Sequence, residues 1–340
     1  MVVPAAGGNG IMTIIRREIQ YPFDLLQPQL NSKDCYMPCE LEYDDDEMIL
    51  FTLFDDEDLL RMATILQEKH PEVYCYTPFW LRILLYRRSC KLKARGLSVN
   101  ARAKELSVRL GTISRWDKGQ TPFKRRKPPK LVPEFGFLFG TALGDGKVDI
   151  SKLRRGCALI AYKLRDQDLA EAIYEAAIKV IGGAHMYEEN QWYYVGFSNA
   201  IFAELVEVAK IDYSPVIKLL QLFPREILSG LFDTEGGPTV KTKRGAKLLF
   251  SNTNKEIIKL AAELCNLINI HYGINEERRA GYIRSPTNNK LYPIRSRIIY
   301  RFYIHRCCWK RFYNEIGFKT KRKQEKLKQL INEIKFKKVC

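Results

Sequence analysis

Leu138-Phe-Gly-Thr-Ala-Leu-Gly-Asp-Gly146 and Leu228-Ser-Gly-Leu-Phe-Asp-Thr-Glu-Gly236 are two stretches of this chain with one pattern. Each is an apolar run that contains small residues and closes with an acid and a glycine. Residues four apart share one face of a helix, so a helical first stretch would align Gly136, Gly140 and Gly144. A helical second stretch would place Gly230 and Thr234 on the equivalent face.

A glycine inside a helix costs about 1 kcal/mol relative to alanine, so a face built from glycines needs a compensating contact. The obvious contact is very close approach of the other stretch. We therefore expect the two helices to pack face to face and in parallel. Asp145 and Glu235 would then meet at the same end.

Two carboxylates at that place are electrostatically unfavourable. Each faces the negative end of a helix dipole, and each also faces the other acid. A divalent cation resolves both conflicts, and oxygen ligands without a matching His or Cys cluster favour Mg²⁺ over zinc or copper. The alternative is an ordinary buried helix that ends in a glycine cap, which explains one copy better than two.

Both stretches resemble the LAGLIDADG motif of homing endonucleases, with a glycine at the third position and an acid and a glycine at the eighth and ninth. The resemblance extends over about residues 131–330. It implies an α+β fold in which two αββαββα repeats form a pseudo-twofold saddle whose sheets lie on DNA. A small helical domain would precede these repeats.

Local patterns agree with two such repeats. The first contains strand-like segments at 157–163 and 191–198, with helices from 165 to the Gly-Gly pair at 182–183 and over 201–208. The second contains strands at 248–252 and 298–304, a helix over 255–268 with Asn254 as its N-cap, and a helix from 309 onward.

The net charge of +17 is unevenly distributed. Residues 1–60 carry 3 basic and 13 acidic residues, whereas residues 61–130 carry 18 and 4. A polyanion is therefore the natural partner of the later part. An anionic membrane surface is a weaker alternative, because no basic amphipathic helix with a broad aromatic face stands out and no apolar run approaches the ~20 residues that span a bilayer. Without a signal-peptide pattern, we expect a soluble, intracellular protein of the cytoplasm that associates with the nucleoid.

The nine cysteines form no CxxC pair. Only Cys35 and Cys39 are closely spaced, and no second ligand pair follows them, so the sequence does not favour a structural zinc. Scattered cysteines in an odd number are typical of reduced thiols in a cytoplasm.

Composition divides the chain into five parts. They are an acidic N-terminal segment of unassigned role at 1–75, a helix-turn-helix domain at 76–123, a basic linker at 124–130, a first repeat at 131–221, and a second repeat with a basic C-terminal helix at 222–340. Within the acidic segment we expect an edge strand at 48–54 and a helix at 59–69. The acidic runs could cover the basic surface when DNA is absent, but a solvated acidic face is the better interpretation.

Residues 97–119 read as helix, turn and helix, preceded by a basic helix over 79–95. They resemble the helix-turn-helix modules of DNA-binding regulators. In those modules the second helix enters the major groove, so this helix would expose Thr112, Ser114, Arg115 and Lys118 while Ile113 and Trp116 pack inward. The alternative is a helical hairpin packed on the nuclease core.

Basic residues near each motif would supply further DNA contacts, because a β-ribbon fits the major groove and Arg or Lys reaches both guanine edges and phosphates. Any one of them could instead belong to a merely solvated face. The set is Arg154, Arg155, Arg165, Lys241, Lys243, Arg244, Arg295 and Arg297.

The family resemblance implies metal ions between Asp145 and Glu235, with the carbonyls of Gly144 and Thr234 as further ligands. It also places a basic residue late in the strand after each motif, to polarise water or stabilise the transition state. Lys163 matches that place in the first repeat, although it could be only a phosphate anchor. The second repeat has Asn252-Thr253 there. That half would use Asn252 to position water, take Lys241 or Lys243 instead, or cut more slowly.

The sequence therefore predicts a monomeric, Mg²⁺-dependent, site-specific endonuclease of homing type that acts on double-stranded DNA. Two unequal repeats in one chain suit an asymmetric target. One alternative is a transcription regulator of LAGLIDADG plus helix-turn-helix type that does not cleave. Another is an intron RNA maturase. An intein is disfavoured, because the chain opens without a Cys or Ser nucleophile and ends without a His-Asn pair.

Overall fold

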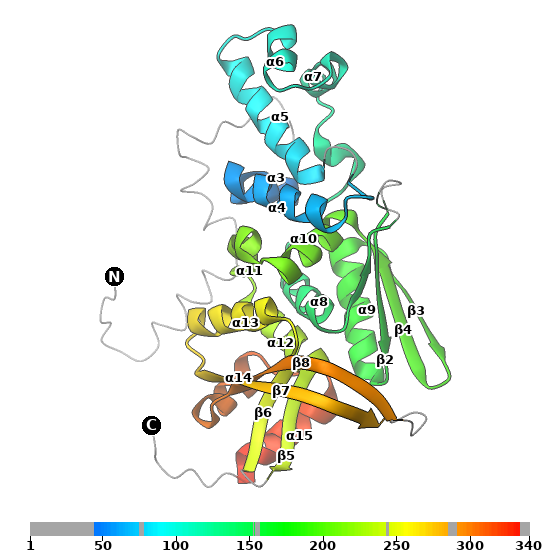
Figure 1. Cartoon of the computed structure of the whole chain (residues 1–340), viewed down its shortest axis with the longest axis vertical. Helices are drawn as coiled ribbons and strands as arrows, with labels where there is room; N and C mark the ends of the chain where they lie inside the picture. The colour runs from blue at the N-terminus through cyan, green and yellow to red at the C-terminus, as the bar shows by residue number, and fades with distance from the viewer. Residues whose placement is uncertain are drawn as a thin grey trace, which may run out of the picture. The chain divides into compact units, whose positions relative to one another are not determined.

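The computed structural model describes residues 44–74, 78–151, 153, 157–242, 245–284 and 291–333 (Figure 1). It divides into two compact units. The first holds the described residues up to Pro128 together with Pro215–Leu222, and the second holds Pro129–Ser214 and the described residues from Phe223 onward. None of the helices in the described ranges is long and apolar enough to cross a membrane.

The second unit contains two copies of one element order. The first copy runs α8 (Pro133–Gly144), β1 (Lys147–Asp149), β2 (Leu159–Leu164), α9 (Gln167–Ile181), β3 (His185–Glu189), β4 (Trp192–Ser198) and α10 (Ala200–Ile211). The second runs α12 (Pro224–Glu235), β5 (Gly236–Thr242), β6 (Gly245–Asn252), α13 (Lys255–Leu267), β7 (Tyr272–Arg284), β8 (Leu291–Ile304) and α14 (Trp309–Glu315), and α15 (Lys321–Glu333) follows. This order confirms the predicted α+β class with two αββαββα repeats.

Each repeat builds a four-stranded antiparallel sheet, in the order β1-β2-β4-β3 and β5-β6-β8-β7. In the first sheet Lys163 pairs with Tyr194, and in the second Asn252 pairs with Tyr300. The identical strand order shows that the repeats correspond throughout, not only at their motifs. Figure 1 shows α9 along the first sheet and the long β7–β8 hairpin of the second.

The paired motif helices α8 and α12 are in backbone contact, as the glycine faces predicted. A side chain on Gly140 would collide with the backbone of Ile227, and one on Gly230 would collide with the carbonyl of Phe137. The same approach continues to the helix ends, where a side chain on Gly144 would collide with the hydroxyl of Thr234. Glycine at these places therefore permits a separation that no other residue allows.

Aromatic side chains fill the core of each repeat. Phe135, Phe139 and Phe202 contact one another in the first, with ring centroids 5.6–5.7 Å apart. Phe232 and Phe250 contact each other in the second, with centroids 5.0 Å apart. All five side chains are fully buried, and burying each contributes roughly 1.5–3 kcal/mol.

Local signals fix several helix ends. The side chain of Asn254 accepts a hydrogen bond from the backbone N–H of Glu256, which confirms it as the N-cap of α13. Gly182 ends α9 in the left-handed region at φ 85°, where a side chain would be strained. The local pattern did not reveal β3, because every residue of this strand is exposed and buried and exposed positions do not alternate along it.

The first unit is helical, with α3 (Asp45–Leu53), α4 (Asp56–Lys69), α5 (Phe79–Ala94), α6 (Val99–Glu105), α7 (Leu110–Asp117) and α11 (Ile217–Leu220), and with short 3₁₀ turns at η1 (Pro122–Arg125) and η3 (Ser214–Val216). The buried Arg87 of α5 donates to the carbonyls of Phe51 and Phe54 and pairs with Asp56 at 3.1 Å. One guanidinium thereby joins the end of α3 to the start of α4.

The predicted edge strand at 48–54 is wrong, because α3 covers residues 48–53 and Phe54 is its C-cap. The Asp44 side chain accepts a hydrogen bond from the backbone N–H of Glu47, and the acidic first turn suits the positive end of the helix dipole. The helix predicted at 59–69 and the basic helix predicted at 79–95 are present as α4 and α5.

The helix pair α6 and α7 lies where a helix-turn-helix was expected. Arg102 of α6 is buried and forms two hydrogen bonds to Asp117 of α7, at 3.0 and 2.5 Å. Ile113 is fully buried and Trp116 packs edge-on against Tyr86 of α5. The DNA-binding role of this pair, and the domain boundaries proposed at 75 and 123, stay predictions.

The segment between the two repeats is part of the first unit. Lys218 of α11 forms ion pairs at 2.8 Å with both Asp55 and Asp58, the residues that cap α4. These pairs are partly exposed, so each contributes at most about 1 kcal/mol. They nevertheless show that acidic residues near the N-terminus have a structural partner.

Gly230→Ala should destabilise the second unit, because the added methyl group would meet the backbone of α8. We expect a loss of about 1–3 kcal/mol in the free energy of unfolding despite the better helix propensity of alanine. Urea denaturation of the full chain, followed by circular dichroism, measures it. Gly183→Ala is the control, since its new Cβ would meet open space. Equal midpoints for the two variants would contradict the close packing.

Candidate functional site

The two motif acids lie at the adjoining ends of α8 and α12. Asp145 directly follows α8, and Glu235 is the last residue of α12. The Cγ atom of Glu235 lies 3.0 Å from the point where a side chain on Gly144 would begin. The acids are close enough for the charge of Asp145 to act on Glu235. The structure thus brings together the pair that the motifs predicted.

Partial desolvation raises the pKa of both carboxyl groups, although Asp145 keeps an exposed side chain and Glu235 is half-buried. The pKa of Glu235 reaches about 7, first through burial and then through the negative charge of Asp145. The charge of Lys323 lowers the pKa of Asp145, and the hydrogen bond from Asn252 and the charge of Lys210 lower that of Glu235, but neither set cancels the rise. When both acids are ionised, the positive charge around them therefore does not balance their negative charge. This excess negative charge favours the binding of a cation.

Asn252 is in direct contact with one acid. Its Nδ2 donates to Oε1 of Glu235 over 3.0 Å, and its Oδ1 accepts from the backbone N–H of Asn254 over 2.7 Å. The second bond fixes the orientation of the amide, because only the oxygen can accept from an N–H. Asn252 therefore orients the carboxylate of Glu235.

The first repeat holds a different group beside its motif helix. Tyr162 is buried there, and its hydroxyl lies 3.2 Å from the hydroxyl of Thr141 in α8. Burial raises the pKa of Tyr162, and the charge of Asp145 adds to the rise, so this phenol stays protonated. The two halves of the site thus differ beside their acids.

Two lysines that the sequence analysis did not single out lie beside the acids. Lys210, near the end of α10, donates to the carbonyl of Gly146 over 3.1 Å and acts electrostatically on Glu235. Lys323, in the first turn of α15, donates to the carbonyl of Asp233 and acts on Asp145. Burial lowers the pKa of both lysines. Each acid therefore has a half-buried lysine from the opposite repeat beside it.

The start of α15 is held from both repeats. The buried carboxylate of Asp233 accepts from the backbone N–H groups of Lys319 at 2.7 Å and Thr320 at 3.2 Å. From the first repeat, Asp168 accepts from the backbone N–H of Lys321 at 2.5 Å. These bonds fix the helix turn that carries Lys323.

Two shallow depressions adjoin Glu235. Ser251, Asn252, Thr253 and Ile299 complete the lining of one. The other lies between the start of β5 and α15, and its basic lining residues are Arg322, Lys323 and Lys326. This second depression offers three cations beside a motif acid, a combination that suits a phosphate group.

Lys163 lies on the exposed face of β2, opposite the buried Tyr162. Its Nζ is 5.0 Å from the ring centroid of Trp192 and 5.2 Å from that of Tyr194. The guanidinium of Arg165 also lies over Trp192, at 4.6 Å. In the described part of the chain, no hydrogen bond or ion pair joins Lys163 to either motif acid. Its surroundings are those of a surface cation held by aromatic rings.

The structure describes some of the other residues that were predicted to contact DNA. Arg115 and Lys118 are exposed on and just after α7, and Thr112 and Ser114 are half-buried. Lys241 lies in β5, and Arg295 and Arg297 lie in β8. Arg154, Arg155, Lys243 and Arg244 fall outside the described residues.

The donor set suits a hard divalent cation. Two carboxylates converge there, and the last carbonyls of α8 and α12 extend beyond the intrahelical bonding pattern. Gly144 and Thr234 supply those carbonyls. The hydroxyl of Thr234 is already bonded to the carbonyl of Gly230 at 2.9 Å, so its side chain does not compete for a metal.

The raised pKa of Glu235 predicts a pH dependence of stability in the metal-free protein. Its folded value of about 7 exceeds the ordinary 4.5, so its contribution is complete below about pH 4.5 and is lost as the pH rises through 7. Between pH 5 and pH 8, we expect the free energy of unfolding of the wild type to fall by about 1–3 kcal/mol relative to that of Glu235→Gln. The fall is modest because Glu235 is partly exposed to solvent.

Urea denaturation in a chelating buffer measures this difference. Asp145→Asn serves as the control, because it removes the second cause of the shift and leaves the larger one, burial. It should therefore shrink the pH dependence without abolishing it. If the free energy of unfolding of the wild type differed from that of Glu235→Gln by the same amount at every pH, the raised pKa of Glu235 would be contradicted.

Comparisons with known proteins identify one domain within the second repeat. Residues 223–317 match a family model described as a LAGLIDADG-like domain. The uncharacterized protein MJ0398 of Methanocaldococcus jannaschii is 24% identical over 241 residues, which cover 68% of this chain and 84% of that protein.

Two solved homing endonucleases align at low similarity. I-DmoI, in complex with DNA and Ca, has a TM-score of 0.39 and 14% identity over 58% of this chain and 98% of its own. I-WcaI, bound to its DNA recognition sequence, has a TM-score of 0.37 and 17% identity over 58% of this chain and 87% of its own. The residues that match the LAGLIDADG-like domain contain Glu235 and its motif, and the same element order precedes them in the first repeat.

Proposed function

We propose that this protein is a metal-dependent, site-specific endonuclease of homing type that cleaves double-stranded DNA. The observation that carries the proposal is the arrangement of acids and lysines from both repeats at the ends of α8 and α12. One acid from each repeat lies beside the other, and each has a half-buried lysine from the opposite repeat within electrostatic reach. A purely structural helix pair has no need of four ionisable side chains at one end.

Asp145 and Glu235 would hold the divalent metal, with the carbonyls of Gly144 and Thr234 as further oxygen donors. When bound, Mg²⁺ would lower the pKa of a water and neutralise charge on the phosphate. The protein contributes orientation: Asn252 fixes the carboxylate of Glu235, and the close packing of α8 and α12 sets the separation of the two acids.

Lys210 and Lys323 would stabilise the negative charge that develops on the pentacoordinate phosphate. Both are held in place by hydrogen bonds to backbone carbonyls, so little side-chain reorganisation is needed as the charge grows. Their partial burial weakens competition from water. Arg322 and Lys326, which line the depression with Lys323, would anchor the neighbouring phosphate.

The open faces of the two sheets would bind the duplex. On the first sheet, Lys163 and Arg165 lie over Trp192, and Tyr187 stacks on Tyr194 with centroids 5.0 Å apart. Aromatic rings hold these cations in fixed orientations, which suits contacts to phosphates and base edges. We assign Lys163 to this surface and not to the reaction centre.

Asp145→Asn or Glu235→Gln should abolish cleavage and leave DNA affinity nearly unchanged. The loss of one metal ligand should cost several kcal/mol in the activation barrier, on the order of a 1000-fold lower rate. The test uses a duplex target selected from a random library by its affinity, with Mg²⁺ and then with EDTA. If wild type binds this target and never cuts it, the non-cleaving regulator replaces the proposal.

Lys210→Met and Lys323→Met should each lower the cleavage rate by about 100- to 1000-fold, since each removes a preorganised cation. Because the lysines serve different acids, each variant should slow one strand more than the other and accumulate nicked plasmid. Lys259→Met is the matched control: this exposed lysine of α13 pairs with Glu256 at 2.7 Å. Lysine variants that cut both strands at the control's rate would contradict their assigned role.

A further inference from the structure

We propose a second metal site in this protein, made by His271, Cys307 and Cys308 and selective for a thiophilic divalent cation such as Zn²⁺. The potential ligand atoms of these three side chains all lie within 4.8 Å of one another. Sulfur and imidazole ligands favour zinc, whereas the motif acids favour a hard cation. This site is independent of the proposed nuclease activity.

The measured separations match the edges of a tetrahedral site. Metal–sulfur bonds of about 2.3 Å and metal–nitrogen bonds of about 2.0–2.1 Å would place two sulfurs roughly 3.8 Å apart and a sulfur and a nitrogen roughly 3.6 Å apart. The Sγ atoms of Cys307 and Cys308 are 3.9 Å apart, and Nδ1 of His271 lies 3.8 Å from Sγ of Cys307. The remaining separation, between the ligand atoms of His271 and Cys308, is at most 4.8 Å, so a contraction of no more than about 1.2 Å would complete the set.

The backbone already holds the ligands in place. The N–H of His271 donates to Sγ of Cys308 over 3.2 Å. The carbonyl of His271 accepts from the N–H of His305 over 2.9 Å, and the carbonyl of His305 accepts from the N–H of Cys308 over 3.0 Å. The first two bonds join the segment before β7 to the turn after β8, and the third closes the turn itself.

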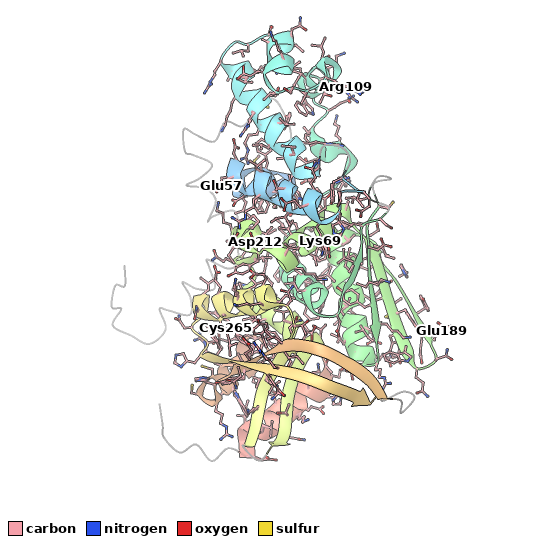
Figure 2. The ribbon with its side chains drawn as sticks, viewed as in Figure 1. Glu57, Lys69, Arg109, Glu189, Asp212 and Cys265 are labelled. Carbon is pink, nitrogen blue, oxygen red and sulfur yellow. The ribbon has the colours of Figure 1, made fainter. Side chains whose placement is uncertain are left out.

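Exposure is graded across the cluster. Cys308 is buried, whereas His271 and Cys307 are exposed, so a metal can enter from solvent and water can fill a fourth position. A neighbouring thiol, Cys265 on α13 (Figure 2), is fully buried. Cys265 is not among the three residues whose ligand atoms lie within 4.8 Å of one another.

A metal at this place would tie together the two ends of the longest hairpin in the described structure. His271 immediately precedes β7, and Cys307 and Cys308 lie in the 3₁₀ turn η4 (Arg306–Cys308) that follows β8. Tyr272 and Ile304 are paired across these strands. The bound cation would therefore add a restraint at the open end of the β7–β8 ribbon, beside the backbone hydrogen bonds there and the stacking of Tyr272 on Phe302.

The test is a zinc titration of the reduced full-length protein, stripped of metal and freed of chelator. Competition with a chromogenic zinc indicator should give one tightly bound Zn²⁺ per chain, and Co²⁺ should give thiolate charge-transfer and tetrahedral d–d absorption. Loss of a hydrogen-bond partner to a metal ligand already lowers affinity about 10- to 100-fold. Loss of a ligand in Cys307→Ser or His271→Ala should therefore exceed about 100-fold.

Both altered side chains are exposed, so these variants should fold, and circular dichroism checks that they do. The matched controls are Cys157→Ser, an exposed cysteine in the first repeat, and the double variant Cys35→Ser/Cys39→Ser. Controls that retain the tight site support the proposal. Three outcomes overturn it: no tight binding by wild type, binding that survives in Cys307→Ser and His271→Ala, or binding lost only in the double variant.

Discussion

The backbone contact between α8 and α12 is the constraint on which the rest of the second unit depends. Without glycine at positions 140 and 230, the helix axes would have to separate by the width of a side chain. The two acids that end these helices would then separate too. The cores of both repeats, filled by phenylalanines, lie behind this contact and stabilise it. The distance between the two motif acids therefore depends on glycines in the interface between α8 and α12.

Close approach of two acids creates a charge problem that the fold solves only in part. Lys210 and Lys323 come from opposite repeats, and their charges reduce the pKa rise of Glu235 and Asp145 without removing it. A cluster that remained fully compensated would have little affinity for a metal. Incomplete compensation keeps the acids available, and it is the same property that would make the cation-free protein sensitive to pH.

The motifs revealed what lies close in sequence. Gly140, Asp145 and their counterparts in the second repeat follow a local spacing, and the resemblance that these motifs carry implies the α+β class and the repeat order. Lys210 and Lys323 carry no such signal, because only the tertiary packing of α10 and α15 brings them to the acids. The strand predicted at 48–54 is wrong because a short apolar run has no period that distinguishes a strand from a helix. The side chain of Asp44, which caps α3, favours the helix.

The placement of residues 215–222 bears on how such a chain can be cut or recombined. The chain crosses between the two compact units at three points, after residues 128, 214 and 222. The N-terminal unit is therefore completed by a segment borrowed from between the repeats, in which Val216, Leu219 and Leu220 are fully buried. A fragment that begins at residue 129 would retain these apolar side chains but lose the helices grouped with them. The N-terminal unit is therefore built from two separate segments of the chain, so it cannot be exchanged by cutting the chain at one place.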